Sequence, residues 1–253
     1  MTGILLPEHH KQLGKLQQNA GFSRRGMLGG LSLGALTMLT GCDLTDDHNV
    51  IDRTLRAMLR FNDDVQAALF SPYRLARTFR RDQITTPFRF NAYYPMDKIP
   101  QIDANDWQLE LAGKVVNKKP WSLQDLLVLP QESQITRHIC VEGWSQIGEW
   151  RGIPLGDFLR HVGADLTARY VGFNCGDDYY SSIDMPSALH PQTILALEFG
   201  QVPLTATWGA PLRLRIPTKL GFKNPKYITA ITITDENPGG YWEDQGYNWF
   251  SGS

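Results

Sequence analysis

Apolar and polar residues follow one another in short stretches along this chain, and the pattern predicts short helices and short strands in mixed order. A helical period of apolar residues runs over residues 50–70. Charged residues interleave with the apolar ones there, which indicates a surface helix packed on a body. Two shorter helices are predicted at 122–129, with Ser122 as N-cap and Asp125 at N3, and at 153–162.

Short runs rich in β-forming residues predict the strands. They cover residues 107–116, 134–141, 170–174, 179–183, 194–198, 212–216 and 228–234. Strands and helices in this order argue for an α+β fold with mixed, mainly antiparallel sheets and short helices, not for a doubly wound parallel sheet. The motifs GxGxxG and GxxxxGK[ST] are both absent, which excludes the dinucleotide-binding and P-loop classes.

The composition is that of an ordinary globular protein. Of the 253 residues, 42% are hydrophobic, and the formal net charge is −1. A near-neutral chain lacks the basic character of nucleic-acid-binding domains, so we expect no nucleic acid partner. Three cysteines cannot build a disulfide framework, and the sequence has neither a CxxC nor an HExxH motif, which argues against a structural zinc site or a zinc protease.

The first 42 residues are organised like an export signal. Arg24-Arg25 precedes an uncharged stretch, residues 26–41, which contains five glycines and is short for a membrane-spanning helix. This order resembles a twin-arginine (Tat) signal. The sequence Leu39–Cys42 resembles a lipoprotein box, in which Cys42 is lipidated. We therefore expect a periplasmic protein, or one anchored on the periplasmic side of a membrane through Cys42.

These features divide the chain into three parts. They are a signal segment at residues 1–42, a tether and surface helix at 43–87, and one domain at 88–253. Because the Tat route moves proteins that are already folded, it suits a protein that receives a cofactor before export.

Residues 137–150 are the strongest candidate for a functional site. Cys140 lies near the end of a predicted strand, next to Glu142, Gly143 and Trp144. Strand ends that face a loop are frequent positions of active sites. A cysteine there could be a nucleophile, half of a disulfide, a metal ligand or a buried small residue, and the local sequence leaves these alternatives open.

Several motifs in a fixed order resemble those of a known family. They are Arg137-x-x-Cys140-Val141-Glu142-x-Trp144-Ser145, Trp150-x-Gly152-Ile153-Pro154-Leu155, Gly209-Ala210-Pro211-Leu212-Arg213-Leu214-x-Ile216-Pro217, Lys219-x-Gly221-Phe222-Lys223-x-x-Lys226 and Gly240-Tyr241-Trp242-Glu243. From about residue 88 to residue 249 the chain resembles the sulfite oxidase-like molybdopterin oxidoreductases. It is most similar to the exported bacterial branch that includes the periplasmic methionine sulfoxide reductases.

The resemblance implies a sulfite oxidase-type domain that binds molybdopterin with one molybdenum. Cys140 would supply the protein thiolate to the metal, which suits a soft, sulfur-rich site. Arg213 and Lys226 would hold the phosphate end of the pterin, with help from the loop Asn224-Pro225-Lys226, since arginine and lysine both bind phosphate.

Other positions extend this implied site or depart from it. Asn91 and Tyr94 match the Asn-x-x-Tyr loop with which the family contacts its cofactor, although an aromatic packing loop is an alternative for them. Cys175 stands where the exported relatives carry a cofactor-contacting threonine, and Trp208 stands where they carry an asparagine. In an oxidising compartment a Cys140–Cys175 disulfide is a further alternative, and it would remove the metal ligand.

The chemistry near Cys140 bears on the substrate. Glu142, as an acidic neighbour of the implied metal ligand, disfavours an anion such as sulfite, while Arg137 and His138 are candidates for a polar wall. Reduction of a small sulfoxide or N-oxide is therefore the lead reaction, and oxidation of sulfite or another small sulfur compound is the alternative. The sequence has no CxxCH motif for a c-type haem. We therefore expect an external electron carrier, such as a membrane or periplasmic cytochrome or a quinol-linked subunit.

Two other classes of protein stay open. One is a hydrolase that uses Cys140 with His138, His161 or His190, which requires a histidine within hydrogen-bond reach of the thiol. The other is a lipid-anchored binding module without chemistry, in which Cys140 is a core residue.

Overall fold

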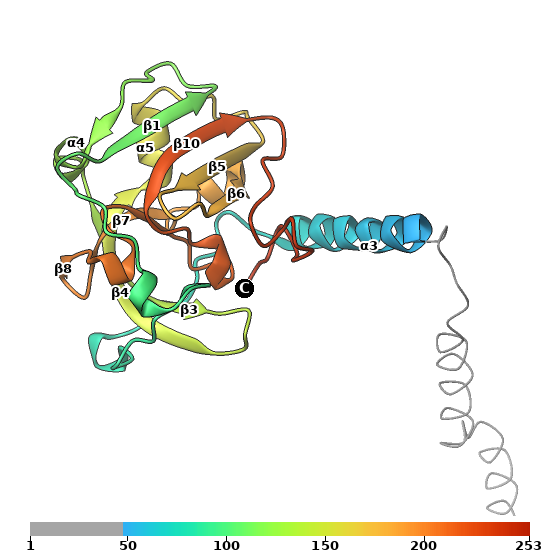
Figure 1. Cartoon of the computed structure of the whole chain (residues 1–253), viewed down its shortest axis with the longest axis horizontal. Helices are drawn as coiled ribbons and strands as arrows, with labels where there is room; N and C mark the ends of the chain where they lie inside the picture. The colour runs from blue at the N-terminus through green and yellow to red at the C-terminus, as the bar shows by residue number, and fades with distance from the viewer. Residues whose placement is uncertain (1–47) are drawn as a thin grey trace, which may run out of the picture. The chain divides into compact units, whose positions relative to one another are not determined.

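Within residues 48–253, which the computed structural model describes, two five-stranded sheets form the framework (Figure 1). The first sheet has the order β2-β1-β10-β5-β6. Its strands are β1 (Gln108–Gly113), β2 (Trp121–Ser122), β5 (Tyr170–Cys175), β6 (Tyr180–Asp184) and β10 (Ile228–Thr234). β1 and β10 run parallel, and the other neighbouring strands are antiparallel.

The second sheet is antiparallel throughout and carries the candidate site. It has the order β3-β4-β7-β8, and β9 also pairs with β7. Its strands are β3 (Glu132–Ile139), β4 (Ser145–Pro154), β7 (Ile194–Phe199), β8 (Val202–Pro203) and β9 (Arg213–Arg215). The predicted α+β fold with mainly antiparallel sheets is confirmed.

The helices are few and mostly short. They are α3 (His48–Leu69), α4 (Leu123–Leu127), α5 (Leu155–His161) and α6 (Met185–Ala188), with 3-10 turns η1 (Arg81–Gln83), η2 (Met96–Lys98), η3 (Ala206–Trp208) and η4 (Gly221–Lys223). The predicted capping of α4 is confirmed, because Ser122 Oγ accepts a bond from the Asp125 amide at 3.2 Å and the Asp125 carboxylate accepts one from the Ser122 amide at 3.0 Å.

Helix α5 begins later than the periodicity predicted. Ile153 and Pro154 belong to β4, where they pair with Leu195 and Ile194 of β7. The pairing with a neighbouring strand thus overrides the helical pattern of these two residues, and the helix starts at Leu155.

The core is built from alternating strand residues. On β1, Leu109 and Leu111 are buried, and on β10, Ile231 and Ile233 are buried. Helix α5 adds Phe158 and Leu159 to the same cluster. Full burial of such side chains stabilises the fold by about 1.5–3 kcal/mol each, so this cluster gives the sheets a rigid base from which the site loops project.

Helix α3 is present as predicted, but the expected packing of its apolar side is not observed. Met58, Phe61 and Leu69 are 63%, 70% and 80% exposed. No helix within residues 48–253 is long and apolar enough to cross a membrane. The predicted signal segment at residues 1–42, with its lipidation site at Cys42, lies outside the described residues.

Candidate functional site

A hairpin of the second sheet presents Cys140 at its tip. Strands β3 and β4 pair up to Ile139 and Ser145, and residues 140–144 form the connection. The Cys140 amide donates to the carbonyl of Trp144 at 2.9 Å, and the Gly143 amide donates to the carbonyl of Cys140 at 3.1 Å. Gly143 has φ of +88°, a left-handed conformation that favours glycine. The hairpin therefore fixes the position of the thiol.

The surroundings of Cys140 combine one carboxylate and one arginine. Cys140 Sγ lies 3.8 Å from Glu142 Oε2, which also accepts a 2.7 Å bond from Trp144 Nε1. The Arg89 guanidinium lies 4.8 Å from the Trp144 ring centroid. Burial, and secondarily the charge of Glu142, raises the pKa of Cys140. The free thiol is thus protonated at neutral pH, and a metal would displace that proton on binding.

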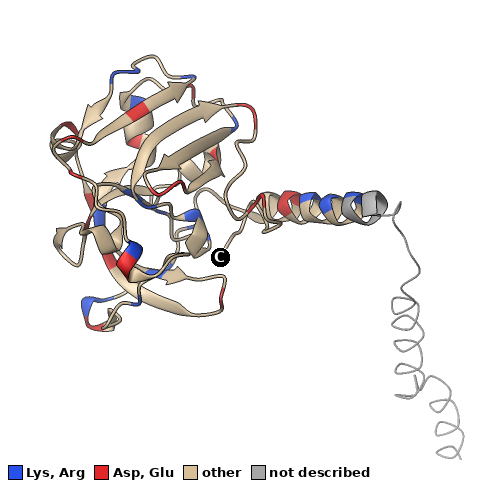
Figure 2. Ribbon diagram, in the orientation of Figure 1, with Lys and Arg blue, Asp and Glu red and all other residues tan. Residues whose placement is uncertain are grey.

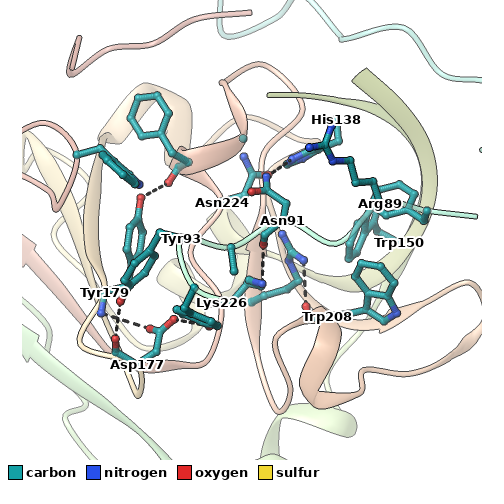
Figure 3. A pocket seen from close by; sticks show the side chains of 17 residues that line it. Arg89, Asn91, Tyr93, His138, Trp150, Asp177, Tyr179, Trp208, Asn224 and Lys226 are labelled. Atoms are coloured by element: carbon teal, nitrogen blue, oxygen red, sulfur yellow. Dashed lines mark hydrogen bonds between the residues drawn. The ribbon is translucent and has the colours of Figure 1, made fainter. Parts of the chain in front are cut away.

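A pocket opens beside this hairpin (Figure 3). It is lined by five of the predicted cofactor residues, namely Asn91, Tyr94, Arg213, Asn224 and Lys226. Cys140, Glu142, Cys175 and Pro225 are not among its lining residues, and their assignment to the site stays a prediction. His138, two residues before Cys140, and Arg89, which contacts Trp144, both line the pocket and connect it to the hairpin.

Two cations in the pocket, the buried Arg213 and the half-buried Lys226, have no carboxylate partner within 4 Å among residues 48–253. Arg213 donates to the Trp208 carbonyl at 2.9 Å, and its Nε has no partner. Lys226 Nζ donates to the Asn91 carbonyl at 2.7 Å. Burial lowers the pKa of Arg213 to about 10. Burial, with the charge of Arg213, lowers the pKa of Lys226 to about 7, although Asp177 partly offsets this.

Other buried lysines of the same segment are paired. Lys219 Nζ lies 3.3 Å from Asp184 Oδ1, and Lys223 forms an ion pair with Glu243. Buried charges are ordinarily paired in this way, because an unpaired charge is costly to desolvate. Arg213 and Lys226 therefore fit an anionic ligand in the pocket, and the phosphate of molybdopterin is such a group.

The positive charges of this pocket affect the protonation of His138. Its ring is buried, and burial together with the charges of Arg215, Arg213 and Lys226 places its pKa well below the ordinary value. The neutral ring has its Nε2 3.2 Å from Asn91 Nδ2. A Cβ at Gly221 would lie 2.7 Å from His138 Nε2, so only glycine allows this close approach.

Asn224 and Arg215 support the pocket from behind. The Asn224 side-chain oxygen accepts bonds from Arg215 Nη1 at 3.0 Å and from the Ile216 amide at 2.9 Å. Arg215, which sequence reasoning missed, also donates to the Arg137 carbonyl at 2.6 Å, and burial lowers its pKa to about 9. The Asn224 oxygen thus positions the segment that carries Lys226.

The opposite wall is aromatic and acidic. Tyr94 donates to Asp177 Oδ2 at 2.9 Å, and burial raises the pKa of Asp177. Figure 3 shows Asp177 and Tyr179 on one side of Lys226, with Trp150 and Trp208 on the other. Arg213 lies over the Trp150 ring at 4.5 Å. Flat aromatic walls and buried cations suit a planar, anionic ligand.

The two departures from the family pattern have clear positions. Cys175 is buried, and both it and Cys140 are free thiols, so the alternative of a Cys140–Cys175 disulfide is wrong. Burial raises the pKa of Cys175 well above its ordinary value. Trp208 lines the pocket with its ring packed 5.5 Å from Phe88, and its carbonyl accepts the bond from Arg213.

The hydrolase alternative finds no support in the described residues. A hydrolase would need a histidine base in hydrogen-bond contact with Cys140. His138 instead contacts Asn91, and His190 Nε2 lies 3.2 Å from the Arg74 carbonyl. His161 packs against Trp121. Within residues 48–253, the Cys140 thiol makes its side-chain hydrogen bond to Glu142, which is not a histidine.

Metal binding at Cys140 would need ligands from a cofactor. Among residues 48–253, no three His, Cys, Asp or Glu side chains are placed to hold a metal ion. Cys140 alone offers a single sulfur ligand there, as in a site where a dithiolene supplies the rest.

Sequence reasoning missed the lining residues Arg89 and Asp177, and it gave no individual role to Trp150 and Trp242, which stand in the family motifs. Arg89 lies two positions before Asn91, and Asp177 lies two positions after Cys175. Their nearness to predicted site residues was the one available signal, since nothing in an irregular loop specifies which side chains point inward.

Comparison with known proteins shows the family of this chain. The family model described as an oxidoreductase molybdopterin binding domain matches residues 96–242. A protein of Azospira oryzae, named as a candidate protein-methionine-sulfoxide reductase subunit, is 54% identical over 98% of this chain and 94% of its own length. The protein-methionine-sulfoxide reductase catalytic subunit of Xanthomonas campestris is 34% identical over 62% of this chain and 55% of its own length.

A solved structure shows the same fold. The sulfane dehydrogenase SoxCD of Paracoccus pantotrophus superposes with a TM-score of 0.51 at 19% identity, over 55% of this chain and 40% of that chain. The molybdopterin and molybdenum expected from the sequence accord with the family match and with the buried cations of the pocket. The chain belongs to the family of oxidoreductases with a molybdopterin-binding domain of the sulfite oxidase type.

Proposed function

We propose that this protein is the catalytic subunit of an exported sulfoxide reductase. The observation that carries the proposal is a pair of cations without carboxylate partners, the buried Arg213 and the half-buried Lys226, in a pocket beside the hairpin that holds Cys140. The names of the Azospira and Xanthomonas relatives, both given as protein-methionine-sulfoxide reductase subunits, support the choice of substrate. The reaction consumes two electrons and two protons and turns a sulfoxide into a sulfide and water.

The chain's own residues would bind and orient the cofactor. Arg213 and Lys226 would hold its phosphate, and Asn91 and Tyr94 would line its path toward the hairpin. Cys140 would give the thiolate ligand. Molybdopterin, when bound, supplies a two-electron redox centre at its molybdenum.

In this proposal, Glu142 handles the protons of the reaction. Its carboxylate lies beside Cys140 and is exposed, and the bond from Trp144 Nε1 holds it in place. A carboxyl group at this position can pass a proton to the oxygen that leaves the sulfoxide. The same negative charge disfavours an anionic substrate, which favours a neutral sulfoxide over sulfite.

The hairpin tip is open to a large substrate. Val141 is 44% exposed, and Glu142 beside it is exposed as well. An oxidised methionine on another protein could therefore reach this tip, whereas a substrate of a closed cavity would have to be small. Protein-bound methionine sulfoxide belongs to the proposal for this reason.

Export and electron supply complete the proposal. The predicted Tat signal with Arg24-Arg25 and the lipid anchor at Cys42 would place the enzyme at the periplasmic side of a membrane. Electrons would come from a separate membrane or periplasmic carrier, since the sequence has no CxxCH motif.

The test combines metal analysis with turnover. Protein exported by its own signal should contain about one molybdenum per chain and should oxidise a reduced viologen dye when methionine sulfoxide is added. Cys140→Ser should abolish turnover, while Ser133→Ala, a change at an exposed position of the adjoining strand β3, should retain it. Full activity in Cys140→Ser would remove Cys140 from the mechanism.

The same protein preparation distinguishes sulfoxide reduction from the alternative, the oxidation of a small sulfur compound. If the enzyme reduces ferricyanide with sulfite faster than it reduces any sulfoxide, the oxidation of a small sulfur compound is the function. We expect sulfite to be inert, because of the Glu142 charge beside the thiol.

A further inference from the structure

Helix α3 has an exposed side rich in large apolar residues. Leu55, Met58, Phe61 and Leu69 are 53%, 63%, 70% and 80% exposed, and Val65 is 38% exposed. At 100° of rotation per residue, these positions fall on one side of the helix. Soluble proteins rarely expose a continuous apolar surface of this kind without a binding partner.

Another side of α3 contacts the C-terminal tail of the chain. The Asn248 amide donates to Asp63 at 2.6 Å, and the Phe250 backbone amide donates to the same carboxylate at 2.7 Å. Gln66 donates to Asn248 at 3.1 Å. These contacts tie the last turns of the helix to the C-terminal tail, and they leave the side with Met58 and Phe61 free of such bonds.

The segment that carries this apolar side is basic, with the arginines of the helix on its opposite side. Residues 53–77 contain five arginines and two aspartates, a net charge of +3, in a chain whose total is −1. One of the aspartates, Asp63, is engaged with the tail. Figure 2 shows the charged residues as bands along α3, separated by uncharged positions. Just after the helix, Tyr73 and Leu75 add exposed apolar surface of 89% and 59%.

We propose that α3 binds a lipid bilayer with anionic headgroups, lying in the plane of its surface. The apolar side would enter the boundary between headgroups and acyl chains, and the net positive charge of the segment would attract the anionic headgroups. A helix with a large apolar side, a basic polar side and low mean hydropathy binds membranes in this manner. This inference does not depend on the reaction proposed above.

A second copy of the chain fits this surface less well than a membrane does. Pairing two α3 helices through this side would bury Asn62, which lies among the apolar positions, within a dry seam. A bilayer surface avoids this cost, because the boundary between headgroups and acyl chains is hydrated, and anionic headgroups also attract the net positive charge of the segment.

Hydrogen–deuterium exchange of the full chain tests the proposal. The probes are vesicles of phosphatidylglycerol with phosphatidylcholine, and vesicles of phosphatidylcholine alone. With accessible lipid at ten times the apparent Kd, anionic vesicles should slow the exchange of amides in residues 53–69 about tenfold. The neutral vesicles should slow it less. Because the readout is local to α3, binding through residues 1–47 does not mimic it.

Two variants with the same added charge make the test specific. Met58→Glu places a carboxylate in the apolar side and should remove the protection. Ala67→Glu places it at an exposed position on the far side of the helix and should leave the protection in place. The proposal fails if neither vesicle protects residues 53–69, or if both variants behave alike. Protection by native membranes but not by lipid vesicles would show a membrane protein as the partner, and it would overturn the lipid proposal.

Discussion

Replacing Lys226 with methionine should make the cofactor-free protein more stable while it weakens cofactor binding. Burial and the nearby Arg213 lower the pKa of Lys226 from 10.5 to about 7. A fall of this size means that keeping Lys226 protonated costs about 5 kcal/mol more in the folded protein than in the unfolded one. Methionine fills the same space without charge. The lost bond to the Asn91 carbonyl, 2.7 Å long, costs about 1–2 kcal/mol.

The net gain in the free energy of unfolding is therefore about 3 kcal/mol, which for a domain of this size raises Tm by about 6–12 °C. The gain depends on pH in a defined direction. Below pH 7 the lysine is protonated in both the folded and the unfolded state, so the full cost is present in the wild type. Between pH 7 and 10.5 the folded protein loses the proton first, so wild-type stability rises and the advantage of Lys226→Met shrinks.

Thermal unfolding of protein purified from cells without molybdopterin measures this effect at pH 6 and pH 10. Lys118→Met, a change at an exposed lysine, is the matched control and should shift Tm little at either pH. In cells that make the cofactor, Lys226→Met should contain less molybdenum than the wild type. A Lys226→Met protein that is less stable than the wild type at pH 6 would refute the reasoning about the unpaired charge.

Three further changes test other parts of the site and fold. Gly221→Ala places a Cβ 2.7 Å from His138 Nε2, so molybdenum content should fall while the far-ultraviolet circular dichroism stays unchanged. Trp144→Phe removes the hydrogen bond from Trp144 Nε1 to Glu142. If that bond is worth about 1.4 kcal/mol, kcat for sulfoxide reduction should fall about tenfold, and its pH profile should change. An unchanged pH profile would argue against Glu142 as the proton donor. Ser122→Ala removes the N-cap of α4 and should cost about 1 kcal/mol in urea unfolding, with turnover retained.

The sequence predicted the regular elements well where one periodicity dominates. Strand β10 (Ile228–Thr234) alternates apolar and polar residues, and its predicted bounds are those observed. Strand β4 was missed, because glycines interrupt its pattern. A Cβ at Gly152 would lie 2.0 Å from the Leu195 carbonyl, and one at Gly148 would lie 2.8 Å from the Phe88 ring. Close packing therefore requires glycine at positions where strand propensity favours a larger residue.

The candidate site could be predicted in part, because its residues lie in ordered motifs, while the loops that complete it carry no periodic signal. Asp177 illustrates the difficulty. It follows β5 in a turn, where Asp178 adopts a φ of +62°, and turns of this kind commonly contain aspartate for local reasons. Only the fold shows that Asp177 accepts a bond from Tyr94, a residue 83 positions away in the chain. Side-chain direction in such loops depends on contacts between distant segments, which no local pattern encodes.

The basic residues of β9 and of the segment that leads to β10 show most clearly what the structure adds. Arg213, Arg215, Lys219, Lys223 and Lys226 look alike in the sequence, and all are buried or half-buried. The structure separates them by partner: Lys219 and Lys223 have carboxylates, and Arg215 is bonded to backbone and amide oxygens. Arg213 and Lys226 have single carbonyls and face the pocket. Since an unpaired buried charge is costly, these two are the positions where an anionic ligand would regain the most free energy on binding. They are also the two that the family motifs single out for the cofactor phosphate, so the physical and the sequence arguments converge on the same pair.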